Sequence, residues 1–177
     1  MTSGLSPDLL EALAYMLPAY VANGTPVVAV RFFRSLHPLD LGRRAWDGRR
    51  LLGDGKTAEG FASGSAMGFL AGTLVLLADP LLYRAWAEPL LLALGALLGD
   101  LLGAFIKRRL GLQRGQPAPG LDQLDFLAVG LLLTFLLYGP PSWATSWVLL
   151  GLAVITVGLH LLTNAAAHAM RLKERPY

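Results

Sequence analysis

Long apolar stretches constrain this chain more than any other feature of its sequence. A helix needs about 20 mostly apolar residues to cross a bilayer, and five stretches reach or approach that length. Only 15% of the residues are charged, against roughly 25% in a soluble domain. We therefore predict an all-α integral membrane protein built as a single domain with five transmembrane helices. The predicted spans cover about residues 9–33, 61–78, 84–107, 122–138 and 143–170.

The first predicted span is interrupted by polar and helix-breaking residues. Pro18 and Pro26 flank the pair Asn23-Gly24, and proline removes a backbone donor and crowds the preceding turn. This pattern predicts unwound backbone within the span. Irregular backbone at membrane depth is tolerated only where it is buried or lines a cavity. We therefore expect Asn23 to line a substrate cavity.

Basic residues are distributed on one side of this topology. All 15 Lys and Arg residues except Arg84 lie in or beside the two long loops, 34–60 and 108–121, or in the C-terminal tail. The positive-inside rule makes that side cytoplasmic, so the N-terminus is expected outside and the C-terminus inside. The same asymmetry explains the basic character of the chain without a nucleic-acid partner. Trp86, Tyr138, Trp143 and Trp147 lie near predicted span ends, where aromatic belts are expected.

The second predicted span carries a stripe of glycines. Gly60, Gly64, Gly68 and Gly72 are spaced four residues apart, which places them on one helix face. Small residues allow close helix contact in lipid. The stripe therefore predicts tight helix packing, either within the chain or between two copies, and the oligomeric state stays open.

Acidic residues near the basic side are candidates for chemistry. Asp100 lies inside an apolar run, where a carboxylate is costly unless it faces a cavity, a cation or a metal. Asp122 and Asp125 share a helix face at the start of the fourth span, although Asp122 alone would also suit a helix cap. Hard carboxylate oxygens suit Mg²⁺, which is usually shared with substrate phosphates. We predict a magnesium site formed by Asp100, Asp122 and Asp125; a lysine partner or a packing hydrogen bond is the alternative for Asp100.

The long loop contains the string LLGDGKTAEGF. Glycines beside a lysine and a threonine are typical of phosphate cradles, although the first glycine of a Walker A loop would fall at Arg50. A solvated turn is the alternative interpretation. The carboxylates and the basic loops together favour phosphoryl or nucleotidyl transfer, in which positioning and charge neutralisation do most of the catalysis. The candidate phosphate-binding residues here are Gly53, Asp54, Gly55, Lys56 and Thr57.

Several strings in this order resemble the CDP-archaeol synthase family of archaea over nearly the whole chain. They are PAYVANGTPVV, PLD, DGRRLLGDGKTAEGF, GDLLGAFIKRRLGL, PAPGLDQLDF and HLLTN. That family is similar to the phosphatidate cytidylyltransferases, whose signature has a basic pair, a histidine-glycine-glycine turn and a D-R-x-D string. Lys107 and Arg108 match the basic pair, and Asp122 and Asp125 match the two aspartates. Gln123 replaces the arginine and PAPG replaces the histidine turn, so no histidine-based step is expected.

The resemblance implies a reaction in which CTP and 2,3-di-O-geranylgeranylglyceryl phosphate give CDP-archaeol and pyrophosphate with Mg²⁺. It also implies a cavity open sideways to lipid. Under this hypothesis Lys56 and Thr57 hold the terminal phosphates of CTP, and Lys107 or Arg108 steers the lipid phosphate. A lipid or polyprenol kinase and a small transporter remain alternatives. Against a transporter, the acidic residues gather at one membrane face, and inverted repeats are not evident.

Overall fold

The computed structural model describes residues 6–172 and contains helices and loops over that range. Four of its helices are long and apolar enough to cross a membrane, and the bent pair formed by the first two helices can serve as a fifth span. The predicted all-helical membrane fold with a long loop after the first span is therefore confirmed. The helices are α1 (Pro7–Tyr15), α2 (Leu17–Ala29), η1 (Val30–Phe32), α3 (Ala58–Ala78), α4 (Glu88–Arg109), α5 (Leu121–Tyr138) and α6 (Ser146–Ala169).

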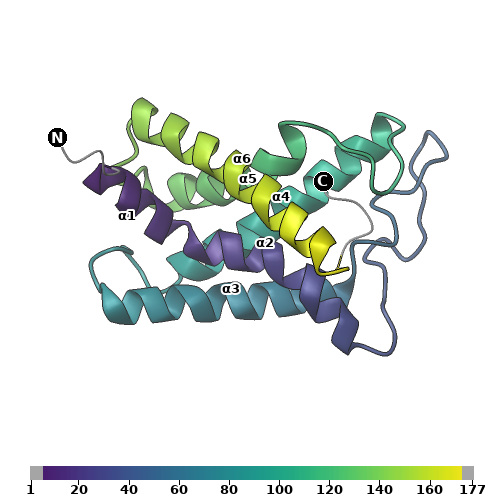
Figure 1. Cartoon of the computed structure of the whole chain (residues 1–177), viewed down its shortest axis with the longest axis horizontal. Coiled ribbons are helices and arrows are strands. Elements are labelled where there is room, and N and C mark those ends of the chain that lie inside the picture. The colour runs from purple at the N-terminus through teal and green to yellow at the C-terminus, as the bar shows by residue number, and fades with distance from the viewer. Residues whose placement is uncertain (1–5, 173–177) are drawn as a thin grey trace.

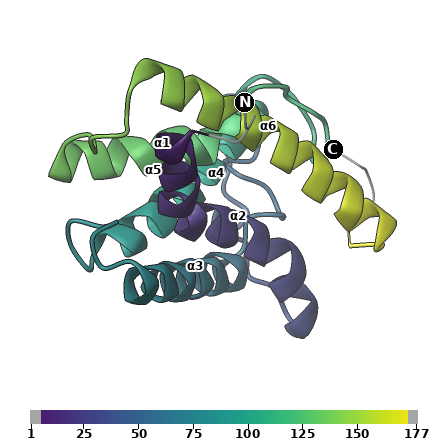
Figure 2. The same ribbon diagram turned by 60° about the vertical axis from the view of Figure 1, so that its left-hand side comes forward.

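Figure 1 shows how these helices distribute the connections between two ends of the bundle. The α2–α3 and α4–α5 loops lie at one end, called here the basic end, together with the last turn of α6. The start of α1 and the α3–α4 and α5–α6 connections lie at the opposite end. α2 packs between α3 and α4, and α5 packs on α4. α6 crosses the others obliquely, as the turned view in Figure 2 makes clear.

Helix starts follow from local capping residues. The hydroxyls of Ser6, Thr57 and Thr145 accept hydrogen bonds from backbone N–H groups in the first turns of α1, α3 and α6, which satisfies donors that a helix start leaves unpaired. α4 begins at Glu88 rather than near residue 84 because Pro89 occupies its first turn, where proline needs no donor.

The break in the first span lies earlier than the sequence predicts. α2 runs without interruption through Asn23 and Pro26, and the chain bends by 45° before Pro18. Thr25 donates a hydrogen bond of 2.6 Å to the Val21 carbonyl in the turn before Pro26. The prediction of unwound backbone around Asn23 was therefore wrong, because one proline can be accommodated when neighbouring groups satisfy the backbone.

The carbonyl groups at the bend itself have a partner from another segment. The Tyr83 hydroxyl lies 3.4 Å from the Ala14 oxygen and 3.2 Å from the Tyr15 oxygen and donates to them. Pro18, in the first turn of α2, has no N–H to offer those carbonyls. The α3–α4 connection thus stabilises the bend of the first span.

The glycine stripe of α3 faces the interior and brings α2 and α4 close. A Cβ at Gly68 would lie 2.7 Å from the Cβ atoms of Ala22 and Ala93. A Cβ at Gly72 would lie 2.3 Å from Pro89 Cβ. These distances are shorter than any ordinary contact, so only glycine permits this packing. The stripe serves packing within the chain.

A buried carboxylate explains Arg84, the basic residue that lies at the opposite end among residues 6–172. Glu88 is fully buried and accepts a hydrogen bond of 2.5 Å from the Tyr15 hydroxyl. Arg84 forms an ion pair with Glu88 and donates to the carbonyl of Tyr138 at 2.8 Å. Trp143 is also buried and packs edge-on against Tyr15, so it does not join a lipid-facing aromatic belt as expected.

Candidate functional site

The three predicted aspartates gather where α4 and α5 pack at the basic end. Gly99 and Gly103 give α4 a smooth face, and Asp125 lies directly on it: a Cβ at Gly103 would be 2.0 Å from Asp125 Oδ2. Asp125 is close enough to Asp100 and Asp122 for electrostatic interaction. The antiparallel helix pair therefore brings together carboxylates that are more than twenty residues apart in the sequence.

Lys56 reaches into this cluster from residues 53–57, called the glycine loop. Its Nζ lies 2.6 Å from each carboxylate oxygen of Asp100, and both side chains are about one-third exposed or less. Hydrogen bonds between two charged groups are shorter and stronger than those between neutral groups. The lysine partner considered for Asp100 in the sequence is thus present, and it comes from the phosphate-cradle candidate.

A second lysine–aspartate pair stands beside the first. Lys107, in the last turn of α4, donates a hydrogen bond of 2.8 Å to Asp122 Oδ1. The other oxygen of Asp122 accepts from the Ala118 N–H, also at 2.8 Å. Gln123 accepts from the Gly120 N–H at 2.6 Å and so caps the start of α5. The loop before α5 is therefore held by the same residues that form the motif.

Two arginines of this region have uncommitted guanidinium groups. Within residues 6–172, the Arg108 side chain forms no hydrogen bond or ion pair, and its Nε is buried without a partner. Arg114 approaches the glycine loop, with its Nε 3.4 Å from the position of a Cβ at Gly55. Sequence reasoning missed Arg114, because the positive-inside rule already accounted for an arginine in that loop.

The glycine loop places its predicted residues in different roles. Gly53 has a φ of 96°, a conformation that favours glycine. The Asp54 carboxylate is exposed and forms an ion pair of 2.9 Å with Arg50. The Thr57 hydroxyl is buried and accepts a hydrogen bond from the Gly60 N–H as the cap of α3.

Asn23 lies half-buried on α2, beside the residue that packs on the glycine stripe. The neighbouring Ala22 carbonyl and Leu97 both contact Gly64, and Asp100 is one helical turn from Leu97 towards the basic end. Asn23 is therefore about one turn from the carboxylates along the bundle, and its side chain forms no hydrogen bond with them.

Oxygen ligands for a hard cation are present, and those of Asp100 and Asp122 bind lysine side chains. Within residues 6–172, no group of three acidic or histidine side chains has the spacing of a metal site. Both oxygens of Asp100 are bound to Lys56, and Asp122 is bound to Lys107. The donor chemistry suits Mg²⁺, and a cation would replace the lysine contacts.

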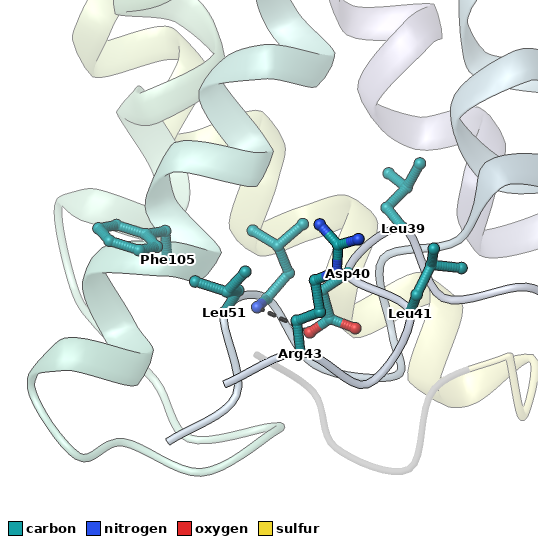
Figure 3. A pocket seen from close by; sticks show the side chains of 7 residues that line it. Leu39, Asp40, Leu41, Arg43, Leu51 and Phe105 are labelled. Atoms are coloured by element: carbon teal, nitrogen blue, oxygen red, sulfur yellow. Dashed lines mark hydrogen bonds between the residues drawn. The ribbon is translucent and has the colours of Figure 1, made fainter. Parts of the chain in front are cut away.

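A cavity of about 320 Å³ lies in the α2–α3 loop against α4, outside the carboxylate cluster. Figure 3 shows its side chains, which come from both segments. Because its lining is mostly apolar, this cavity does not suit a polyanion. It is lined by Leu39, Asp40, Leu41, Arg43, Leu51, Leu52 and Phe105.

Comparison with known proteins supports one family. The family model described as "CarS-like: CDP-archaeol synthase" matches residues 7–177. The chain is 46% identical to a CDP-archaeol synthase of Methanopyrus kandleri, over 100% of this chain and 98% of the relative. It is 47% identical to one of Aeropyrum pernix, over 96% and 93%.

A solved structure also matches. It is described as an intramembrane enzyme for archaeal membrane lipid biosynthesis and has a TM-score of 0.78 and 47% sequence identity, with 88% of this chain and 94% of that chain covered. Fold, motif order and full-length similarity agree with one another. The chain therefore belongs to the CDP-archaeol synthase family.

Proposed function

We propose that this protein transfers the cytidylyl group of CTP to an isoprenoid glycerol phosphate, giving CDP-archaeol and pyrophosphate. The observation that carries the proposal is the pair of lysine–aspartate contacts, Lys56–Asp100 and Lys107–Asp122, together with the uncommitted Arg108 in the same turn of α4 as Lys107. Such a group of cations next to carboxylates suits a polyanionic substrate. The family membership supplies the identity of the substrates.

The proposed reaction needs no strong base. A phosphate oxygen of the lipid attacks the α-phosphorus of CTP, a new P–O bond forms, and the bond to the β-phosphate oxygen breaks with pyrophosphate as the leaving group. Repulsion between two anions is the main barrier, so fixed positive charge lowers it. We propose that Lys56 and Arg114 hold the terminal phosphates of CTP. Lys107 and Arg108 are proposed to hold the lipid phosphate.

Magnesium is part of this proposal. Asp100, Asp122 and Asp125 would hold it, and it would neutralise the triphosphate. The lysines that now bind Asp100 and Asp122 would then turn to phosphate oxygens. Asn23, Gly53, Asp54 and Gly55 are proposed to contact the substrates, while the buried Thr57 supports the loop by capping α3.

We also propose that the basic end faces the cytoplasm, where CTP is available. All described basic residues except Arg84 lie at that end or beside it, and the positive-inside rule applies to loops of up to about 60 residues. The lipid phosphate would enter the same site from the inner leaflet.

A transfer assay with two forms of labelled CTP tests the reaction. We expect label from the α-phosphate to enter the lipid product and label from the γ-phosphate to leave as pyrophosphate. Transfer of γ-label alone would instead identify a kinase, and ion flux without nucleotide turnover would favour a transporter. Chelation should abolish the transfer, and Mg²⁺ should restore it.

Matched aspartate variants complete this assay. Asp100→Asn should lower turnover at least about a hundredfold, as expected for lost charge stabilisation. Asp79→Asn makes the same change at an exposed aspartate after α3, at the end of the bundle opposite the site. This variant should leave turnover unchanged. Full activity in Asp100→Asn, Asp122→Asn and Asp125→Asn together would remove the magnesium model while leaving the transfer reaction itself standing.

A further inference from the structure

Asp40 is a buried carboxylate in the α2–α3 loop that the proposed reaction does not use. It is only 4% exposed. Its oxygens accept hydrogen bonds from Arg50 Nη2 at 2.6 Å and from Arg50 Nε at 3.1 Å. They also accept from the N–H groups of Gly42, Leu52 and Gly53 at 3.1, 3.0 and 2.9 Å. Every oxygen is thus satisfied by the loop that surrounds it, and Figure 3 shows Asp40 among the residues between the loop and α4.

Asp40 binds the backbone at the start of the glycine loop. Leu52 and Gly53 immediately precede the Asp54-Gly55-Lys56 segment. The neighbouring Leu39 N–H donates a hydrogen bond of 2.8 Å to the carbonyl of Lys56 itself. The backbone on both sides of the loop is therefore bound to residues 39 and 40, which fixes the starting point of the Lys56 side chain.

The same region is bound to α4 by reciprocal arginine contacts. Arg49 Nη1 donates to the Arg109 carbonyl at 2.8 Å, and Arg109 Nη2 donates to the Arg50 carbonyl at 2.6 Å. α4 also carries Asp100, the partner of Lys56. The Asp40–Arg50 pair thus connects the glycine loop to the helix that bears the acidic residue opposite it.

The charge state of Asp40 agrees with this role. Hydrogen bonding from Arg50 is the largest influence and lowers the pKa of Asp40, and Asp40 in turn raises the pKa of Arg50. Both groups stay ionised at neutral pH. A buried ion pair loses much of its value when one partner is removed, because the other charge is left uncompensated.

We propose that Asp40 is a positioning residue for nucleotide binding: through Arg50 and the N–H groups of Leu52 and Gly53, it holds the glycine loop so that Lys56 meets the triphosphate of CTP. The inference rests on the proposed cytidylyl transfer. Asp40 contacts no substrate in this scheme. We expect its effect mainly on the nucleotide side of the site, because Asp40 binds the backbone next to Lys56 directly, whereas it reaches the helix of Lys107 and Arg108 only through the contacts of Arg49 and Arg50 with Arg109.

Steady-state kinetics of Asp40→Asn, with each substrate varied separately, tests the proposal. An amide of nearly equal size cannot accept all five hydrogen bonds and places a donor against donors. The KM for CTP should rise about tenfold or more, as expected for weakened bonds to a charged group. The KM for the lipid phosphate should change less than about twofold, a difference too small to reflect a lost interaction of that kind. Equal increases in both KM values, or no change in either, would overturn the proposal.

Two further variants make the result independent of folding. Arg44→Gln removes a hydrogen bond to the Gly48 carbonyl at the tip of the same loop and should leave both KM values unchanged. Arg50→Lys keeps the charge but loses the bidentate contact with Asp40, and it should also raise the KM for CTP. This variant tests the proposal even if Asp40→Asn fails to fold. A wild-type protein without CTP turnover would refute the proposed function instead.

Discussion

At the scale of single residues, Gly103 decides whether Asp125 can occupy its place on α4. The Asp125 carboxylate lies where any side chain at position 103 would begin. The two lysine–aspartate pairs lie beside it, so a shift of Asp125 would disturb the whole cluster. A residue without chemistry of its own therefore controls the geometry of the proposed metal ligands.

We predict that Gly103→Ala lowers activity by at least about tenfold and destabilises the protein by about 1–3 kcal/mol, the usual cost of overpacking. Gly158→Ala is the matched control, because a Cβ there would meet nothing within 4 Å. Transfer assays and thermal melting in detergent measure both effects. Wild-type activity in Gly103→Ala would show that the Asp125 position seen here is not required.

At the scale of elements, α3 acts as the surface on which the bent first span is assembled. Its glycine face contacts α2 through Pro18 and Ala22 and contacts α4 through Pro89 and Ala93. In lipid, where helices gain little from hydrophobic burial, such close contacts supply much of the association energy. The same contacts position α2 beside the end of α4 that carries the site.

Gly68→Ala should therefore loosen the α2–α3–α4 contact. The added methyl group would lie 2.7 Å from three neighbouring atoms, including the Pro18 carbonyl oxygen, and we expect a loss of about 1–3 kcal/mol. Gly151→Ala adds the same methyl group at an ordinary contact distance of 3.5 Å from Leu9. If the melting temperatures of the two variants in lipid nanodiscs were equal, the stripe would not be the packing determinant.

At the scale of the whole molecule, charge separates the two ends of the bundle. At the basic end, arginine side chains donate hydrogen bonds to backbone carbonyls of the neighbouring segment. Lysine side chains there form ion pairs with aspartates. At the opposite end, Arg84 is bound to the buried Glu88. Arg84 is thereby stabilised on the side that the positive-inside rule would leave without basic residues.

The orientation proposed from this asymmetry can be measured directly, because the chain has no cysteine. Leu81 is 92% exposed at the opposite end, and Arg44 is exposed at the basic end. On intact cells, a membrane-impermeant maleimide should label Leu81→Cys. It should label Arg44→Cys only after lysis. The reverse pattern would place the catalytic site outside and contradict the proposal.

Local properties of the chain were sufficient to predict the membrane spans, the gathering of basic residues at one end and the candidate carboxylates Asp100, Asp122 and Asp125. The cost of putting a charge or an unpaired backbone group into lipid depends mainly on the residues of that segment. Asp100 could be singled out for this reason, and Lys56 could be singled out by the glycines and the threonine beside it. The sequence left open whether the two side chains meet. The glycine stripe was likewise predicted to pack closely, since its spacing alone places it on one face.

Contacts between distant segments were decided only by the tertiary structure. The pairing of Lys56 with Asp100, the approach of Arg114 to Gly55 and the burial of Asp40 all depend on how the two loops lie against α4. The bend lies before Pro18 rather than at Asn23. The carbonyl of Tyr15 at this bend accepts a hydrogen bond from Tyr83, a residue of a distant segment. Sequence spacing carries information about neighbours along one helix, whereas the side chains and carbonyl groups that meet across helices depend on packing.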